Sequence, residues 1–132
     1  MLKILIVEDD FVCRQIMKDI LKSFGDFDIV VDGEEAIQAF RLACEDNTPY
    51  DLIFMDIMMP SMDGQEALRQ IRTIEKENDI RGAKEVKVVM TTALNDPKTV
   101  FEAYYQGCAT SYLVKPLTKD KIVKQLKDFN LL

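Results

Sequence analysis

Histidine is absent from this chain of 132 residues, and its absence excludes several kinds of chemistry at once. Without an imidazole there is no histidine acid–base catalysis, no Ser-His or Cys-His dyad, and no access to most zinc sites. Cysteine is scarce, since Cys13, Cys44 and Cys108 are odd in number, far apart and not arranged as C-x-x-C. We therefore expect reduced thiols that act as small apolar side chains in a cytoplasmic protein.

Long apolar runs and an excess of positive charge are missing as well. No apolar run approaches the roughly 20 residues of a membrane span, and Met1-Leu2-Lys3 leads straight into a predicted strand rather than a signal peptide. The net charge of -6 disfavours nucleic acid as a partner, because proteins bind nucleic acid mainly through Lys and Arg. The length suits a single domain that spans residues 1–132.

The most informative stretch of the sequence runs from Asp51 to Pro60. Leu52 to Met55 are four consecutive apolar residues, which is typical of a strand buried on both faces of a parallel sheet. The run ends on Asp56, at a position where a doubly wound sheet places reactive groups, because ligands bind beyond the carboxyl ends of its strands. The alternative is that Asp56 is a turn residue that accepts a hydrogen bond from a nearby amide.

The rest of the chain alternates between strand and helix patterns. Besides the Asp56 strand, we predict strands at residues 2–7, 27–31, 86–90 and 111–114. Apolar residues at helical spacing predict five helices, within residues 13–24, 36–44, 64–74, 96–106 and 118–129, with Gly25 closing the first. The polar segment from Glu75 to Glu85 is predicted to be a helix end and a long solvated loop, with partner docking as the alternative. Five such alternations predict an α/β three-layer sandwich with a parallel sheet, and they leave the strand order open.

Parallel strands would bring a group of polar residues to one edge of the sheet. The group consists of acids, hydroxyls and one ammonium: Glu8, Asp9, Asp10, Asp56, Thr91, Thr92 and Lys115. Two carboxylates about 5 Å apart repel by roughly 3 kcal/mol at an effective dielectric of 20, so we expect a cation among them. Oxygen ligands without histidine or cysteine indicate Mg²⁺, with Mn²⁺ or Ca²⁺ as alternatives. Such a site suits phosphoryl transfer to an Asp carboxylate.

Each residue of this group also has a simpler interpretation. Glu8, Asp9 and Asp10 could form a solvated acidic turn that favours the dipole of the following helix. The two threonines could be ordinary strand formers, and Lys115 a surface charge. Taken one at a time, these interpretations are the better ones, but their coincidence at four strand ends favours a shared site.

The same motifs resemble the receiver domains of two-component response regulators over the whole chain. The acidic pair of that family matches Glu8 and Asp9, and its phosphorylated aspartate matches Asp56 in Phe54-Met55-Asp56-Ile57-Met58-Met59-Pro60. Its switch hydroxyl, lysine and switch aromatic match Thr92, Lys115 and Tyr112. The resemblance implies a flavodoxin-like fold with strand order 2-1-3-4-5. It also implies Mg²⁺, or Mn²⁺, on Glu8, Asp9, Asp56 and the backbone carbonyl of Met58, and a cis Lys115-Pro116 peptide.

The function implied by this resemblance is that of a single-domain response regulator in a phosphorelay. Asp56 would accept a phosphoryl group from a histidine kinase or a histidine phosphotransfer protein, in a reaction that depends on Mg²⁺. Movement of Thr92 and Tyr112 would then reshape a surface for a downstream protein target. Such a protein is not an enzyme beyond catalysing its own phosphorylation and dephosphorylation. We expect a monomer, or a weak dimer that depends on phosphorylation.

Two apolar residues depart from what many receivers carry. Met58 and Leu94 stand two residues after Asp56 and Thr92, where polar side chains are common in the family. Apolar groups there would screen an acyl phosphate from water, so we expect slow self-dephosphorylation. Met58→Asn should then shorten the lifetime of the phosphorylated form, and an unchanged lifetime would contradict the expectation.

Three rival interpretations fit the sequence less well. An aspartyl phosphohydrolase would carry a second Asp two residues after the nucleophile, where Met58 stands. A flavin-binding domain would need a hydroxyl- or glycine-rich loop after the first strand, where Glu8-Asp9-Asp10 would repel phosphate. A degenerate receiver that acts only as a binding module would lack part of the acid, Asp, Thr and Lys set, and here every member is present.

Overall fold

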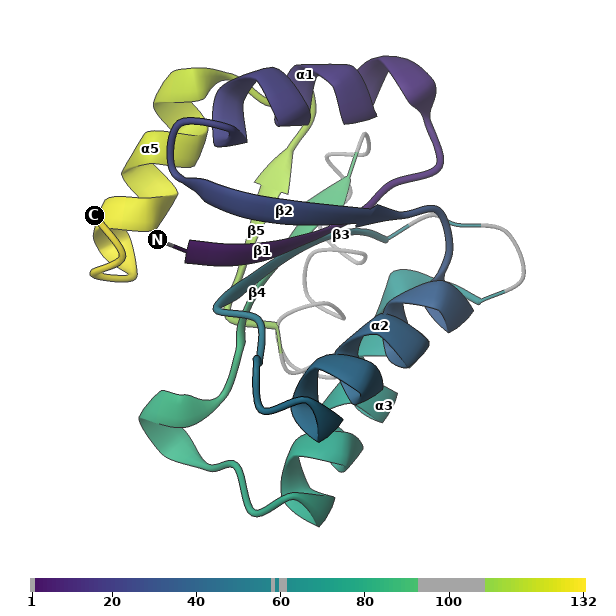
Figure 1. Cartoon of the computed structure of the whole chain (residues 1–132). Helices are drawn as coiled ribbons and strands as arrows, with labels where there is room; N and C mark the ends of the chain where they lie inside the picture. The colour runs from purple at the N-terminus through teal and green to yellow at the C-terminus, as the bar shows by residue number, and fades with distance from the viewer. Residues whose placement is uncertain (1, 58, 60–61, 93–108) are drawn as a thin grey trace.

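Five parallel strands form the centre of the molecule. The computed structural model describes residues 2–57, 59, 62–92 and 109–132 (Figure 1). The strands are β1 (Leu2–Val7), β2 (Gly25–Val30), β3 (Leu52–Asp56), β4 (Lys87–Thr92) and β5 (Ser111–Val114). They pair in the order β2-β1-β3-β4-β5, all parallel, which confirms the predicted flavodoxin-like sheet. The carboxyl ends of all five strands therefore lie at the same edge.

Helices cover both faces of this sheet. They are α1 (Phe11–Leu21), α2 (Gly33–Glu45), α3 (Gly64–Glu77) and α5 (Lys119–Asp128), with a 3-10 turn η1 (Gly82–Lys84) before β4. In Figure 1, α1 and α5 lie on one face of the sheet and α2 and α3 on the other, so the architecture has the three layers that were predicted. The helix predicted at residues 96–106 lies outside the described residues.

Two apolar cores explain why the strands read as continuous apolar runs. On one side, residues such as Leu5, Ile53 and Val88 pack with side chains of α2 and α3. On the other, residues such as Ile4 and Phe54 pack with side chains of α1 and α5. Each central strand is thus buried on both faces, as in other parallel sheets.

Each of the four described α-helices has a side-chain N-cap at its first turn. Asp10, Asp32, Asp63 and Thr118 each accept a hydrogen bond from the backbone N–H three residues later, at 2.8–3.3 Å. Such caps satisfy amides that the first helical turn leaves without a partner. Asp10 matters most for function, because it fixes the start of α1 directly after the acidic turn.

The predicted element boundaries on either side of Gly25 are wrong. Gly25 does not close α1, which ends at Leu21; it begins β2 and pairs with Leu2 in the parallel register. A Cβ on Gly25 would lie 2.2 Å from the backbone oxygen of Leu2, so glycine is needed there for close strand approach rather than for a helix end.

Among the described residues, no helix has the length and apolar character needed to cross a membrane.

The segment from Glu75 to Glu85 is less solvated than predicted. Glu75 belongs to α3 and is 1% exposed. Its carboxylate pairs with Arg72 at 2.7 Å and accepts a hydrogen bond from the Val86 N–H at 2.7 Å. Most residues between Glu77 and Lys84 are exposed, as expected for a loop. The prediction of a helix end followed by a solvated loop is therefore confirmed, but the burial of Glu75 within the helix end was not predicted, because it sits in a run of polar residues.

Candidate functional site

Strand register brings the predicted site residues to one place. Val7 pairs with Met55, so Glu8, which follows β1, lies beside Asp56, the last residue of β3. Asp56 is level with Thr91 on β4, and the N–H of Lys115 donates to the backbone oxygen of Thr92 at 2.7 Å. Segments more than a hundred residues apart in the sequence thus meet at the carboxyl edge.

Three carboxylates gather at this edge. Glu8, Asp9 and Asp56 each place one oxygen so that all three lie within 4.8 Å of one another. Glu8 and Asp56 are buried, at 1% and 6% exposure, whereas Asp9 is exposed to solvent. The cluster therefore has a closed side formed by the sheet and an open side at Asp9.

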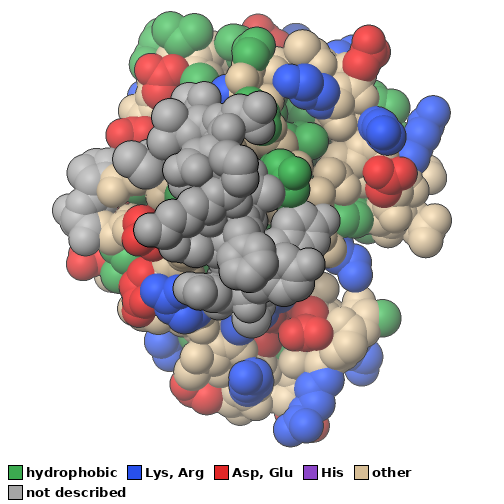
Figure 2. Space-filling model, turned by 180° about the vertical axis from the view of Figure 1, so that it is seen from behind, with side chains coloured by type: hydrophobic (Ala, Val, Ile, Leu, Met, Phe, Trp, Pro, Cys, Tyr) green, Lys and Arg blue, Asp and Glu red, His purple; other side chains and the backbone are tan. Residues whose placement is uncertain are grey.

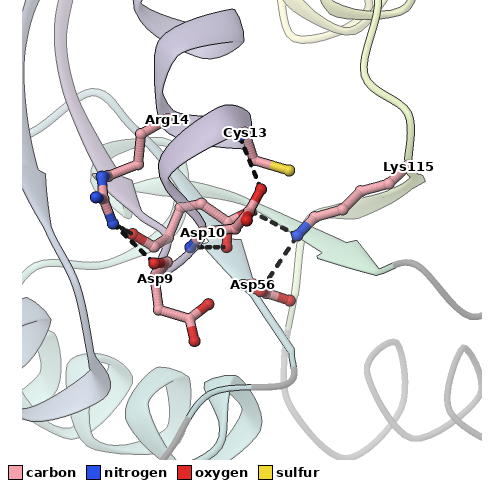
Figure 3. A network of polar contacts seen from close by, with 7 residues as sticks. Asp9, Asp10, Cys13, Arg14, Asp56 and Lys115 are labelled. Atoms are coloured by element: carbon pink, nitrogen blue, oxygen red, sulfur yellow. Dashed lines mark hydrogen bonds and ion pairs between the residues drawn. The ribbon is translucent and has the colours of Figure 1, made fainter.

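Lys115 brings a positive charge into contact with two of these acids. Its Nζ lies 2.5 Å from Glu8 Oε1 and 3.2 Å from Asp56 Oδ2. Figure 3 shows Lys115 reaching toward Asp56. The Lys115-Pro116 peptide is cis, which confirms the expectation for this bond. The lysine thus spans two buried carboxylates that would otherwise repel each other.

The electrostatic environment raises two pKa values. Burial is the main reason that the pKa of Glu8 lies above its ordinary value of 4.5, and the Asp56 carboxylate raises it further, while Lys115 opposes both. Burial lowers the pKa of Lys115, but the carboxylates of Glu8 and Asp56 outweigh that effect and leave it above 10.5. Lys115 is therefore a stable cation, and Glu8 is an acid that gains from further positive charge nearby.

The acidic turn is held to α1 by two residues. Asp10 Oδ2 accepts from the Cys13 N–H at 2.9 Å, and the pKa of Asp10 is lowered first by the Cys13 side chain and then by this backbone hydrogen bond. Arg14 Nη1 donates to the backbone oxygens of Glu8 and Asp9. Figure 3 shows Arg14 beside Asp9. Arg14 was not singled out from the sequence, and this contact was missed. Its position one turn after the cap residue Asp10 was the available signal.

Gly64 closes the other side of the site. Its N–H donates to the backbone oxygen of Ile57 at 2.9 Å, and a Cβ at this position would lie 2.3 Å from the backbone oxygen of Asp56. Glycine at position 64 therefore allows the first residue of α3 to pack closely against the end of β3. The Met62-Asp63-Gly64 motif in the sequence indicated a turn, but not this contact with Asp56.

The carboxylate cluster fits a hard divalent cation. All three side chains offer oxygen atoms, which are the ligands that Mg²⁺ and Ca²⁺ prefer. The cluster contains no histidine or cysteine. Glu8 Oε1 is fully buried and accepts no well-aligned hydrogen bond among the described residues, although it forms the ion pair with Lys115. A buried anionic oxygen of this kind is stabilised by a further cation bound to the same carboxylate cluster.

The remaining predicted residues lie partly within and partly outside the described chain. Thr92 is fully buried at the end of β4, and Tyr112 is half-buried on β5 beside Met90. Tyr112 packs against the core on the α2 and α3 side. Met58, with its proposed carbonyl ligand, and Leu94 lie outside the described residues.

Proteins with similar sequences include response regulators. A family model for the response regulator receiver domain matches residues 4–127. Chemotaxis protein CheY of Listeria monocytogenes is 34% identical, over 96% of this chain and 97% of that protein. Two-component response regulator ORR41 of rice (Oryza sativa subsp. japonica) is 35% identical, over 99% of this chain and 96% of that protein.

Solved structures show the same similarity. The receiver domain of Ssk1 from Saccharomyces cerevisiae, crystallised with the histidine phosphotransfer protein Ypd1, aligns with a TM-score of 0.82 at 28% identity, covering 97% of this chain and 88% of that one. The receiver domain of the histidine kinase CKI1 from Arabidopsis thaliana, complexed with Mg²⁺ and BeF₃⁻, aligns with a TM-score of 0.80 at 26% identity, covering 96% and 90%. Both similarities extend over nearly the whole chain.

Proposed function

The chain belongs to the response regulator receiver family, and from this premise we propose that Asp56 accepts a phosphoryl group from a histidine of a partner protein. One observation carries the proposal. Asp56 is a buried carboxylate at the end of β3, with two acids on one side of it and the Lys115 ammonium 3.2 Å away. This set offers an acceptor, ligands for a cation and a counter-charge in one place.

The acids in this site would hold Mg²⁺, with Mn²⁺ as the alternative. Glu8, Asp9 and Asp56 would supply the carboxylate oxygens, and we expect the backbone carbonyl of Met58 to supply another. A bound divalent cation would offset the negative charge that accumulates when a phosphoryl group approaches a carboxylate. The relative CKI1 was solved with Mg²⁺ and BeF₃⁻, which makes the proposal reasonable for this chain.

In the transfer itself, an oxygen of Asp56 would attack phosphorus in line with the bond to the partner's histidine. A new phosphorus–oxygen bond forms, the phosphorus–nitrogen bond breaks, and the histidine leaves as a neutral imidazole with a proton from solvent. Lys115 is placed to pair with an oxygen of the transferred group, because it already contacts Asp56. Thr92, which follows the strand residue level with Asp56, would hydrogen-bond a further oxygen.

The proposed output is a change of surface at β4 and β5. If Thr92 moves toward the phosphoryl group, space opens for the ring of Tyr112, which lies on the neighbouring strand. Phosphorylation would then favour one of two existing conformations through contacts made only in that one. A protein without a separate substrate would not be an enzyme in the usual sense, since it would act only on its own phosphorylation and dephosphorylation.

The proposed partners are proteins: a histidine kinase or histidine phosphotransfer protein as donor, and a downstream protein target. The Ssk1 receiver was crystallised with such a phosphotransfer protein. The net charge of -6 and the intermixed acidic and basic side chains in Figure 2 suit protein contacts better than nucleic acid. We propose a cytoplasmic protein that is a monomer, or a weak dimer when phosphorylated.

Incubation with acetyl phosphate and Mg²⁺ tests the proposal directly. Intact-mass spectrometry should show the addition of one phosphoryl group, and Asp56→Asn should abolish it. Asp79→Asn is a matched control, because Asp79 is an exposed loop residue with a left-handed φ of 57° that asparagine tolerates. No addition to the wild-type chain, or addition to Asp56→Asn, would refute the proposal and favour a degenerate receiver that only binds.

A further inference from the structure

Arg14 makes an unusual pair of contacts beside the proposed cation site. Its Nη1 lies 3.2 Å from the backbone oxygen of Glu8 and 2.9 Å from that of Asp9, and donates to both. The guanidinium also lies 5.7 Å from the centre of the Phe11 ring. Figure 3 shows Arg14 reaching back from α1 over the acidic turn, away from Asp56 and Lys115.

These two carbonyls belong to the residues whose carboxylates face Asp56. The Glu8 N–H continues the sheet by donating to the backbone oxygen of Val30 at 3.1 Å, but the turn that follows has few other backbone contacts. The Asp10 N–H reaches Glu8 Oε2 only at 3.5 Å, which is a weak contact. Arg14 donates to the carbonyl of both peptide groups, after Glu8 and after Asp9, and so restrains the orientation of both.

Rotation of a peptide group moves the side chains on either side of it. Glu8 and Asp9 must keep their oxygens within 4.8 Å of each other and of Asp56 for the cluster to exist. Their like charges oppose that arrangement when no cation is bound. A donor that fixes both carbonyls keeps the carboxylates converged at little entropic cost when a cation arrives.

We infer that Arg14 is a positioning residue for the cation site: it holds the Glu8 and Asp9 carbonyls so that their carboxylates stay at the spacing a divalent cation requires. The inference rests on the proposed function. Arg14 touches no carboxylate of the cluster in any described contact, so it acts through the backbone of the turn. Partners of this outer kind typically change metal affinity by about 10–100-fold when removed.

The sign of the effect separates positioning from simple electrostatics. A positive charge close to a cation site repels the cation, so an arginine that acted only through its charge would weaken Mg²⁺ binding. Removing it would then tighten binding. A positioning role predicts the opposite, because Arg14→Met should weaken Mg²⁺ binding by about tenfold.

Isothermal titration calorimetry with MgCl₂ on the full chain measures this affinity without relying on activity. We expect Arg14→Met to raise the Kd about tenfold, and Arg14→Lys, which keeps the charge but has a shorter reach and no planar fork, to fall between the two. Lys18→Met is the matched control: it removes one positive charge from α1 one turn later and should leave the Kd unchanged or lower it slightly. An unchanged or lower Kd for Arg14→Met would overturn the inference.

A second readout separates positioning from general damage to the fold. The Mg²⁺ concentration needed for half-maximal phosphorylation by acetyl phosphate should rise about tenfold in Arg14→Met, while the rate at saturating Mg²⁺ returns to near that of the wild type. A saturating rate that stays low would indicate misfolding rather than lost positioning, and would overturn the inference. If Arg14→Met does not fold, the test uses Arg14→Lys, and a Kd equal to that of the wild type would overturn the inference. A wild-type chain that neither binds Mg²⁺ nor gains a phosphoryl group would refute the proposed function itself.

Discussion

Gly64→Ala is the substitution whose effect follows most directly from the geometry of the site. The new Cβ would lie 2.3 Å from the backbone oxygen of Asp56 and 2.8 Å from the terminal methyl of Met90, whereas ordinary contacts begin at 3.4 Å. The methionine side chain can turn away, but the carbonyl cannot. Relief of the overlap therefore requires the start of α3 or the end of β3 to move by about 1 Å.

A movement of that size matters because the contacts of Asp56 are short. Its Oδ2 lies 3.2 Å from Lys115 Nζ, and a reacting group displaced by about 1 Å loses roughly 100-fold in rate. Overpacking of this kind also costs about 1–3 kcal/mol of unfolding free energy. We expect Gly64→Ala to slow phosphorylation by acetyl phosphate about 100-fold, as followed by intact-mass spectrometry over time. Urea unfolding monitored by circular dichroism measures the loss of stability.

Gly25→Ala is the control for this experiment. Its Cβ would lie 2.2 Å from the backbone oxygen of Leu2, an overlap close to the one at Gly64 (2.3 Å), but at the amino end of the sheet. It should cost a similar unfolding free energy and leave the phosphorylation rate of the folded protein unchanged. The reasoning is refuted if Gly64→Ala is phosphorylated at the wild-type rate, or if Gly25→Ala slows the reaction to the same extent.

Three other predictions concern buried charge, pH and the cation. Glu75→Ala should lower the unfolding free energy by about 3–5 kcal/mol in urea titrations, because it removes the carboxylate that pairs with Arg72 and accepts from the Val86 N–H. A loss below about 1 kcal/mol would contradict this prediction. Burial and the hydrogen bond to Asp28 raise the pKa of Tyr50 above 10, so its protonated form stabilises the fold fully below pH 10 and this contribution is lost as the pH rises further. Tyr50→Phe should therefore flatten the decline in melting temperature between pH 10 and 11. An unchanged decline in this variant would contradict the prediction. Mg²⁺ at 100 times its Kd should stabilise the wild type by about 2.7 kcal/mol; Asp9→Asn should reduce that increment in thermal melts, and an equal increment in both proteins would show that Asp9 is not a ligand.

The edge of the sheet could be predicted from the sequence because strand periodicity and chain direction determine it. Apolar runs located β1, β3 and β5, and parallel pairing then required Glu8, Asp56 and Lys115 to meet at their ends. The strand order was available only through the resemblance to receivers, because periodicity says nothing about which strands are neighbours. The structure adds the asymmetry within the acids: Glu8 is buried and Asp9 is exposed, although the two are adjacent in the sequence.

The errors arise where one residue type has several uses. Gly25 follows a helical pattern, as a helix-closing glycine does, but close approach to Leu2 is the reason for glycine there. Glu75 stands among polar residues, and only its tertiary partners distinguish a buried acid from a solvated one. Arg14 is half-buried on α1, and the carbonyls that it contacts carry no sequence signal, because every residue has one.

Lys115 connects the stability of the site with the signal that it would carry. It now offsets two buried carboxylates, at 2.5 Å from Glu8 and 3.2 Å from Asp56. A phosphoryl group on Asp56 would carry more negative charge than the carboxylate, so Lys115 would turn toward it and leave Glu8 less well paired. A buried acid without its partner is costly unless another cation is present, so phosphorylation and cation binding should favour each other. The effects of substitutions at Glu8, Asp56 and Lys115 are therefore expected to be non-additive, since each residue sets the charge that the other two experience.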